Sequence, residues 1–425
     1  MKASKHYILL ILIFFSLITQ AQKINSPYSR FGLGQLHGEN VNTSLMGMGG
    51  ISIAVADPTM INPGNAASYA VYDSTSFIFE IGVNGNLTNS KTVSQSESSS
   101  YFSLNYIMFG FPVTKWWKSS LGMLPYSQIG YDVKIYIPVE GFSNVINSIE
   151  GDGGLNQFYW GNAFKIGENL RLGFDAAFLF GQGSRSSLIY FPDSLNIFGT
   201  KTIAHTRGGD FIFDYGVQYD IKIKTDKLLT LGLIYSNNWN LKAKRESLSY
   251  TLTGGFGEIV ETLQDTIAYS PEENGTIVIP QRFGGGFTLQ ETGRWLIGAD
   301  FEWQNWKKFT SFGATDSLNN SWRIAVGGQF TPEHSSISSL AKRMTYRLGF
   351  RYYDTYLSIF DTPINEFGIS FGFSFPMKKT KTAIDLGVEI GRRGTTANNL
   401  IQENFMNISL GFSIHEHWFH KRRYQ

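Results

Sequence analysis

The chain has 425 residues, no cysteine and a formal net charge of +2 at pH 7. This near-neutral balance of scattered charges provides no basic surface for nucleic acid, and the lack of Cys excludes disulfides and a lipidated cysteine. Aromatic residues make up 15% of the chain, 45 residues are Gly and only 16% are charged, whereas soluble domains carry about 25% charged residues. This composition is typical of a membrane β-barrel.

The first 21 residues predict a secretory signal peptide. A basic start at Lys2 and Lys5 precedes an apolar run over residues 8–18, and Thr19-Gln20-Ala21 is an acceptable cleavage site. The apolar run is too short to span a membrane, and no later run approaches the length of a membrane helix. We therefore expect residues 1–21 to be removed from an exported protein.

Residues 22–75 precede the first clean strand and predict a compact hatch, or plug, around which the later strands close. The stretch from Gly47 to Tyr69 is small and Gly-rich, which permits close backbone approaches. The sequence Asn62-Pro63-Gly64-Asn65 has the residues of a turn. The residues that we expect to shape the hatch are Gly47, Gly49, Gly50, Asn62, Pro63 and Asn65.

Residues 76–425 predict strands of period two. Residues 211–223 and 367–375 alternate apolar with small or polar side chains. In a soluble sandwich the apolar face would point to a core, and in a membrane barrel it points to lipid. The alternation does not separate these two interpretations, but the signal peptide and the strand lengths favour lipid.

Fourteen strands, each long enough to span the membrane at a tilt, fit the pattern. They are expected at 76–89, 100–113, 120–136, 155–166, 169–183, 210–224, 228–242, 276–290, 293–306, 321–331, 343–356, 366–376, 381–393 and 403–417. Short connections then alternate with longer polar loops, notably 137–154, 184–209 and 243–275. We expect an all-β, antiparallel 14-stranded barrel with both termini in the periplasm, although an extra hairpin in 196–208 or 245–253 would change the count by two.

Several segments resemble the FadL family of outer-membrane transporters. The text Asn62-Pro63-Gly64-Asn65-Ala66 is similar to the Asn-Pro-Ala-like end of that family's hatch, with two residues inserted. The strands 215–219, 231–235 and 280–286 and the C-terminal residues 391–419 are similar in order to a divergent branch of the family. The resemblance implies a barrel in the outer membrane of a diderm bacterium. It also implies passive uptake of hydrophobic compounds such as long-chain fatty acids, with hatch movement.

The third predicted strand contains Pro125, flanked by Gly122 and Gly130. Proline cannot donate to a strand ladder, so an interior proline in a closed wall predicts a bulge or a kink. The FadL family is similar in having a kinked third strand, whose gap in the wall releases ligand sideways into the lipid. We therefore expect missing strand-to-strand hydrogen bonds near Pro125, although a harmless bulge near a strand end would also explain this residue.

Charged side chains are expected on the inner face of the wall. Arg347 and Arg351 lie on the polar face of one strand, and Asp300, Glu302, Asp385 and Glu389 also point inward. These residues predict either a charge network that fills the barrel or an anion site for a carboxylate head group, to which an arginine fork is suited.

No catalytic constellation can be assembled, so we expect no enzyme, no cofactor and no catalytic residue. His415 and His417 share a strand face and are placed to bind a metal, but the end of the last strand favours an interface role, and no metal is expected. The expected partners are outer-membrane lipid, a hydrophobic small molecule and possible outer-membrane proteins. One alternative is a scaffold or shuttle in a secretion or assembly complex, and another is an outer-membrane phospholipase.

Overall fold

The computed structural model describes residues 24–36, 41–140, 142–192, 197–253, 262–336, 338–377 and 380–417. The predicted signal peptide, residues 1–21, lies outside these residues. Within the described ranges no helix has both the length and the apolar character needed to cross a membrane.

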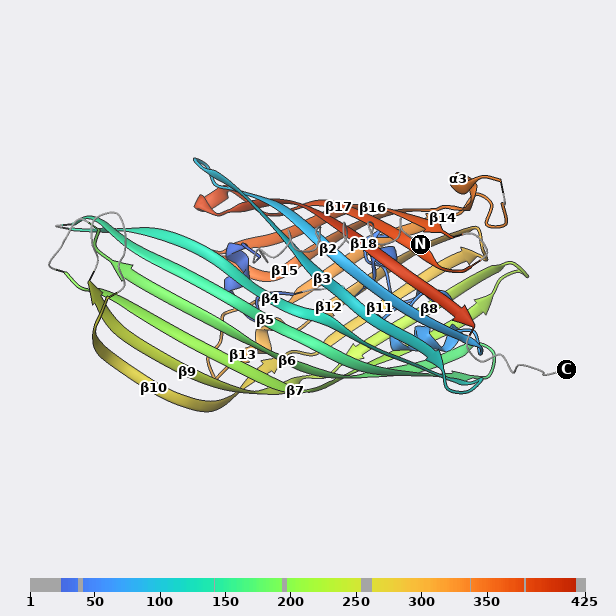
Figure 1. Cartoon of the computed structure of the whole chain (residues 1–425), viewed down its shortest axis with the longest axis horizontal. Coiled ribbons are helices and arrows are strands. Elements are labelled where there is room, and N and C mark those ends of the chain that lie inside the picture. The colour runs from blue at the N-terminus through green and yellow to red at the C-terminus, as the bar shows by residue number, and fades with distance from the viewer. Residues whose placement is uncertain are drawn as a thin grey trace, which may run out of the picture.

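The chain folds into one antiparallel sheet that closes on itself (Figure 1). The long strands are β2 (Ser76–Lys91), β3 (Ser96–Pro112), β4 (Trp117–Val139), β5 (Phe142–Ile166), β6 (Leu170–Tyr190), β7 (Gly199–Lys222), β8 (Lys227–Ser236), β9 (Trp239–Thr253), β10 (Thr262–Ile279), β11 (Arg282–Glu291), β12 (Trp295–Gln304), β14 (Ser321–Phe330), β15 (Thr345–Ile359), β16 (Thr362–Pro376), β17 (Ala383–Gly394) and β18 (Gln402–His417). Two short strands, β1 (Gln35–Leu36) and β13 (Thr310–Ser311), add to the sheet.

The wall has fourteen strand positions, as the sequence predicts, and two of these positions are each filled by two consecutive strands. β8 and β9 both pair with β7 and fill one position that is interrupted at residues 237–238. β11 pairs with β8, β10 pairs with β9, and these two strands fill the next position, which is interrupted at residues 280–281. The last strand, β18, pairs with β2 from Gln402↔Lys91 to His417↔Ser76 and closes the barrel. The N-terminal end of β2 and the C-terminal end of β18 therefore lie at the same end of the barrel.

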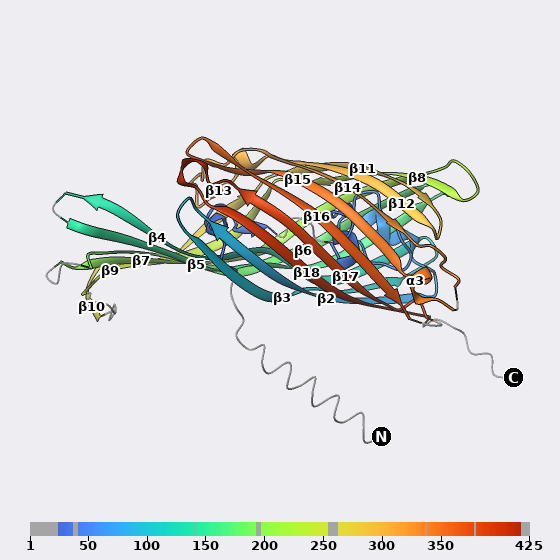
Figure 2. The same ribbon diagram turned by 90° about the horizontal axis from the view of Figure 1, so that it is seen from above.

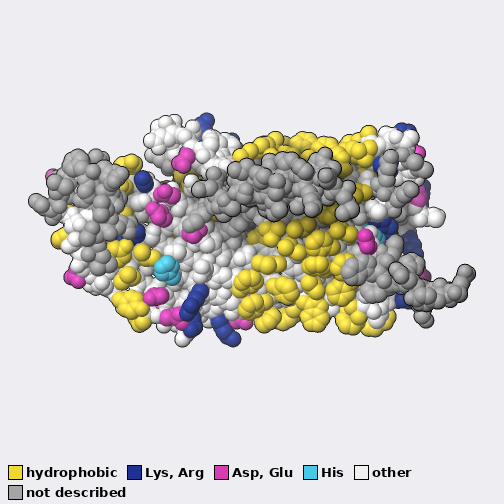
Figure 3. Space-filling view, in the orientation of Figure 1, with side chains coloured by type: hydrophobic (Ala, Val, Ile, Leu, Met, Phe, Trp, Pro, Cys, Tyr) yellow, Lys and Arg dark blue, Asp and Glu magenta, His cyan; other side chains and the backbone are white. Residues whose placement is uncertain are grey.

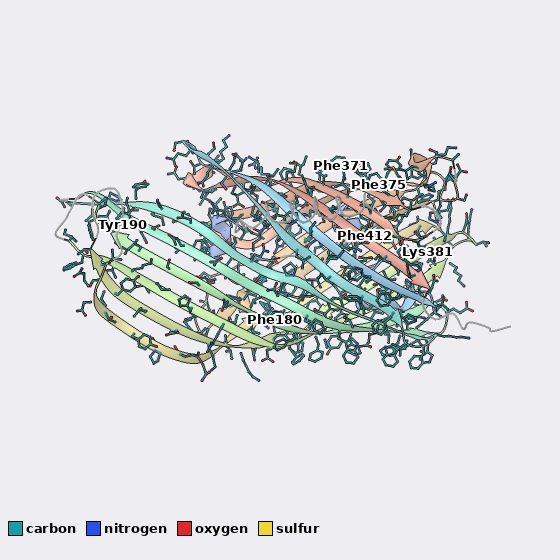
Figure 4. The ribbon with its side chains drawn as sticks, in the orientation of Figure 1. Phe180, Tyr190, Phe371, Phe375, Lys381 and Phe412 are labelled. Atoms are coloured by element: carbon teal, nitrogen blue, oxygen red, sulfur yellow. The ribbon has the colours of Figure 1, made fainter. Side chains whose placement is uncertain are left out.

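The outer surface of the barrel carries an apolar belt. The side chains of Phe371 on β16 and Leu410 on β18 are 43% and 49% exposed, and many other outward residues are large and apolar. Figure 3 shows these side chains gathered over the barrel proper, and Figure 4 labels Phe371, Phe375 and Phe412 among them. Exposed apolar residues that alternate with buried polar ones place this belt against lipid.

Six strands continue well beyond the belt and form a sheet that we call the extension (Figure 2). It consists of residues 127–139 of β4, 142–154 of β5, 181–190 of β6, 199–208 of β7, 239–253 of β9 and 262–279 of β10. The prediction of loops at 137–154, 184–209 and 243–275 is therefore wrong for most of their residues. Strands outside lipid do not need an apolar face, so the apolar alternation used to find strands stops where the belt stops.

The remaining described elements are short helices. They are η1 (Pro27–Arg30), α2 (Thr43–Met46), η2 (Ala66–Val71), η3 (Trp306–Lys308), α3 (Leu340–Arg343) and η4 (Ala397–Asn399). Asn42 caps α2 by accepting a hydrogen bond from the Leu45 amide, and Asn65 caps η2 by accepting one from the Ala67 amide.

A charge in the belt should cost more than a charge in the extension. We expect Phe371→Arg to destabilise the membrane-inserted barrel by about 2–4 kcal/mol, the range for arginine near the bilayer midplane. Ile267 on β10 is 56% exposed in the extension, so Ile267→Arg should leave stability almost unchanged. Denaturant titration of both variants in phospholipid vesicles measures the difference, and equal losses would mean that the belt is misplaced.

Candidate functional site

The described N-terminal residues 24–36 and 41–72, which we call the N-terminal segment, lie within the ring of strands (Figures 1 and 2). Hydrogen bonds tie this segment to opposite sides of the wall. The Gly49 amide donates to Ser370 Oγ on β16 at 2.8 Å, and Gln218 Nε2 on β7 donates to the Ile53 carbonyl at 3.0 Å. Leu45, Ile51 and other apolar residues of the segment are fully buried.

Three buried carboxyl groups on the wall hold the segment through hydrogen bonds. Glu80 on β2 accepts hydrogen bonds from the Ile61 amide at 2.9 Å and from Asn42 Nδ2 at 3.0 Å. Asp300 on β12 accepts hydrogen bonds from the Ser52 and Ile53 amides at 2.6 and 2.9 Å. Arg323 adds an electrostatic attraction at Asp300. Hydrogen bonds from the segment therefore offset part of the cost of burying each carboxyl group.

The third carboxylate, Asp175 on β6, is within hydrogen-bond reach of the Tyr69 hydroxyl at 3.3 and 3.4 Å. Burial and the nearby Asp175 raise the pKa of Tyr69 well above its ordinary value. Tyr69 therefore stays protonated at physiological pH, and its hydroxyl donates to the carboxylate.

The predicted hatch glycines lie where the segment touches the wall. Gly47 ends α2, and a Cβ on it would lie 2.8 Å from the Gly372 Cα. Gly49 has a φ of +72°, and its Cβ would lie 2.9 Å from the backbone of Phe350. The carbonyls of Gly49 and Gly50 accept hydrogen bonds from Arg323 at 3.0 and 3.2 Å. Close backbone contact therefore requires glycine at positions 47 and 49, and the φ of +74° favours glycine at position 50.

The predicted turn residues stabilise the segment itself. Asn62 Nδ2 donates to the Ser52 and Val55 carbonyls at 2.7 and 2.9 Å, and Asn65 Nδ2 donates to the Ile53 carbonyl at 2.7 Å. Pro63 is only half-buried between them. The two asparagines thus join residues 52–55 to the turn, while Pro63 supplies its backbone shape.

A cavity of about 250 Å³ lies between the N-terminal segment and the wall. Its lining includes apolar or aromatic side chains, among them Leu124, Tyr126, Ile212, Trp239 and Tyr353. Charged and uncharged polar side chains make up the other half of the lining. Small-molecule sites combine apolar walls with placed polar groups, and this cavity has a larger polar share than is typical.

The charged residues at the cavity form connected ion pairs. Glu366 contacts Arg351 and Arg393 at 2.5 Å each, and Arg393 reaches Glu403 at 3.3 Å. Ser26 of the N-terminal segment donates to Glu403 at 2.7 Å. The structure therefore contains the charge network that the sequence offered as one of two explanations for the inward charges.

Arg347 and Arg351 do not share one partner. Arg347 lies 3.5 Å from Asp385 and donates to Gln329 at 3.1 Å, whereas Arg351 contacts Glu366 and Glu389. Arg351 lines the cavity and Arg347 does not. A role for either residue in binding a ligand head group stays a prediction, because each guanidinium group already has a carboxylate partner.

The wall is interrupted beside the predicted gate residues. β3 pairs with β4 only from Pro112↔Lys118 to Ile107↔Met123, with Gly122 opposite Met108. Beyond Met123 the two strands are not paired, and we call this unpaired part of the wall the slot. On its other side β4 stays paired with β5, with one extra residue in β4 between Pro125 and Ser127. Pro125 thus lies at the base of the slot and beside a bulge.

Residues 24–36 occupy the lower part of the slot. Gln35 and Leu36 of β1 pair with Gln128 and Ser127 of β4. The Ser26 amide donates to the Gly130 carbonyl at 2.8 Å, and the Gly130 amide donates to Ser29 Oγ at 3.1 Å. A Cβ on Gly130 would lie 2.0 Å from the Ile24 carbonyl oxygen, so glycine is required for this contact. Whether the slot passes a ligand stays a prediction.

No metal site is found among the described residues, in which no group of three or more His, Asp or Glu side chains could hold an ion. His415 is buried, with its Nε2 4.0 Å from Asp73. The side chain of His417 lies outside the described residues.

Sequence reasoning missed how the wall makes room for the segment. Inward glycines on the strands face the segment's backbone, and a Cβ on Gly327 or Gly349 would lie about 2 Å from atoms of residues 48–49. The sequence shows the high Gly content. The positions of glycines on the inward face of each strand were the signal that could have located these contacts.

Comparisons with known proteins agree with the fold. A family model described as BamG matches residues 3–425. The toluene transporter TodX of Pseudomonas putida superposes with a TM-score of 0.60 at 14% identity, covering 91% of this chain and 100% of that one. The toluene transporter TbuX of Ralstonia pickettii gives a TM-score of 0.58 at 13% identity, covering 88% and 98%.

A FadL homologue from Pseudomonas aeruginosa gives a TM-score of 0.57 at 14% identity, covering 89% of this chain and 98% of that one. No curated protein sequence matches the chain. The resemblance to the FadL family that the sequence indicates is thus confirmed at the level of fold, at low identity.

Removing the Asp300 carboxylate should loosen the N-terminal segment. Asp300→Leu leaves the Ser52 and Ile53 amides without their acceptor, at a cost of about 1–3 kcal/mol for each buried group. We expect these two amides to exchange with deuterium roughly 5- to 150-fold faster. The exposed Glu168, which pairs with Lys222 at 3.2 Å, gives the control Glu168→Leu, which should not change their exchange. Unchanged exchange in Asp300→Leu would contradict the assignment.

Proposed function

The chain belongs to the BamG family, and we propose that this member is an outer-membrane channel for passive uptake of hydrophobic compounds. One observation carries the proposal: a cavity inside the barrel reaches the place where the wall lacks strand pairing. Leu124, Pro125 and Tyr126 border both the cavity and the slot. An apolar molecule in the cavity would therefore lie beside the part of the wall that lacks strand pairing.

The similar solved structures support this substrate class. They include toluene transporters, a monoaromatic hydrocarbon channel and a FadL homologue. A small aromatic molecule fits the cavity of about 250 Å³ and would contact apolar lining residues such as Leu124, Ile212 and Trp239. We propose the same class of compound, with longer apolar chains requiring the N-terminal segment to move.

In this proposal the N-terminal segment is the hatch. It fills the ring of strands and also closes the lower slot through β1 and Ser26. Uptake then requires residues 24–36 to leave β4, after which the ligand passes sideways past Pro125. For a ligand with a carboxylate, we propose Arg351 as the contact, because it lines the cavity. The carboxylate of the ligand would replace Glu366 or Glu389 as a partner of Arg351.

The proposed orientation follows from the even number of strands. The ends of β2 and β18 lie together, and Lys381 pairs with Asp73 at 2.8 Å near the same end, where Figure 4 labels Lys381. We place this end in the periplasm and the extension outside the cell. No described group has the arrangement of a hydrolase, and the proposal includes no enzymatic step.

A second candidate is a scaffold in an outer-membrane complex. The extension favours it, since a sheet that projects well beyond the lipid belt is not needed to enclose a ligand. Purification in mild detergent separates the two functions, because a scaffold would retain a stoichiometric protein partner and would not transport.

A disulfide across the slot should stop lateral release. Gln35 and Gln128 are register partners, so their Cα atoms lie at a separation that a disulfide can bridge. We expect the Gln35→Cys, Gln128→Cys variant to lose toluene uptake into vesicles when oxidised and to regain it on reduction. The natural chain has no Cys, so no other disulfide interferes.

The matched control places the bridge in a continuous part of the wall. Phe373 and Leu386 are register partners on β16 and β17, and a disulfide between cysteines at these positions should leave uptake unchanged in both redox states. Full uptake by the oxidised Gln35→Cys, Gln128→Cys variant would eliminate the slot as the exit.

Deleting the hatch should open the lumen. We expect a variant without residues 40–70 to conduct ions more strongly in planar bilayers than the full chain, because the buried apolar residues of this range fill the ring of strands. Conductance equal to that of the full chain would count against the hatch role, and the Glu168→Leu variant is the control for an ordinary surface change.

A further inference from the structure

The extension is a six-stranded sheet with two free edges. Residues 127–139 of β4 pair with β5 on one side. On the other side, the described strand that pairs with them is β1, at Ser127 and Gln128. At the opposite edge of the extension, β10 meets β13 only at Ile277 and Val278. A free edge exposes unpaired N–H and C=O groups, which can accept another strand.

The β10 edge is protected against such pairing. Its register with β9 shifts at three places, between Leu263 and Asp265, between Thr266 and Ala268, and between Ser270 and Glu273. Pro271 lies in the last of these irregularities, and Asp265, Glu272 and Glu273 add like charges. Bulges, proline and charge are the devices by which proteins keep an edge strand from pairing.

Between residues 131 and 137 the β4 edge has two charged residues of opposite sign, Asp132 and Lys134, but no bulge and no proline. Its pairing with β5 is regular from Ser127↔Leu155 to Ile137↔Val145, and the next irregularity comes at Pro138. Two edges of one sheet thus differ, and only the β4 edge is shaped to accept a strand.

The hydrogen bonds of Gly130 show which backbone groups face this edge. Its N–H donates to Ser29 and its C=O accepts from Ser26, so both groups point away from β5. Because direction alternates along a strand, Asp132, Lys134 and Tyr136 also present N–H and C=O to the edge. No described residue pairs with these three residues on that side.

The side chains beside this edge indicate the chemistry of the occupant. Val133, Ile135 and Ile137 share one face of β4, and the cross-strand partners of Val133 and Ile137 are Ile149 and Val145. Ile135 is 39% exposed. An added strand with apolar side chains at alternate positions would continue this face.

The chain itself already uses the same edge in this way. Gln128 pairs with Gln35, and Gly130 bonds with residues 26 and 29. The open positions 132, 134 and 136 continue directly from these occupied ones. We propose that residues 132–136 of β4 bind an extended, alternately apolar strand of a partner protein by strand addition. This proposal does not depend on transport.

A labelled peptide tests the site on the full chain in detergent. The probe is a seven-residue peptide of alternating valine and threonine, and its control is the same peptide with every amide N-methylated. We expect fluorescence polarisation to show binding of the first peptide and none of the second, since strand addition requires the peptide N–H groups. Binding of both peptides, or of neither, would overturn the proposal.

Two variants locate the binding to the edge. Lys134→Pro removes one edge N–H without touching the bonds to β5, and an edge strand tolerates proline. We expect it to weaken peptide binding about tenfold, as the loss of one hydrogen bond predicts, whereas Lys134→Thr keeps the N–H and should bind as the wild type does. Equal binding by folded Lys134→Pro would overturn the assignment, and the N-methylated peptide tests it independently of that variant's folding.

Discussion

Irregular backbone inside a barrel must find hydrogen-bond partners, and this requirement organises the protein. The N-terminal segment has only short helical turns, so its turns pair some of its amides and carbonyls and the others need partners elsewhere. The wall supplies partners through Glu80, Asp300, Gln218 and Arg323. The carboxyl groups of the wall are themselves buried, so they need the segment's amides as donors just as the amides need them as acceptors. The segment and the barrel therefore form one structure.

The same requirement explains how the interrupted wall is tolerated. Where β3 leaves β4 beyond Met123, the edge of β4 would otherwise expose unpaired backbone groups. Residues 26, 29 and 35 satisfy those at Gly130 and Gln128. Release of this part of the segment would unpair several groups together, so the slot has a closed state that is held by a small set of bonds. Such a state is suited to opening and closing again.

Much of the barrel was predictable because lipid imposes a simple pattern. Every expected strand contains outward apolar side chains, and all fourteen strand positions are found. The extension could not be found in the same way, since strands such as 199–208 lie outside lipid and have polar side chains on both faces. Within the site, Asp300 was expected to point inward, but its partners, the amides of residues 52 and 53, depend on a tertiary contact that no periodicity reports. Pro125 was informative because a missing N–H has a local consequence in any strand.

The central claim is that an apolar molecule resides in the cavity between the N-terminal segment and the wall, beside the slot. Crystals of the full chain soaked with 4-bromotoluene would test this directly through the anomalous signal of bromine. The account predicts a bromine peak inside the cavity, near Leu124 and Trp239. Peaks confined to the outer apolar belt, with none inside the barrel, would contradict it.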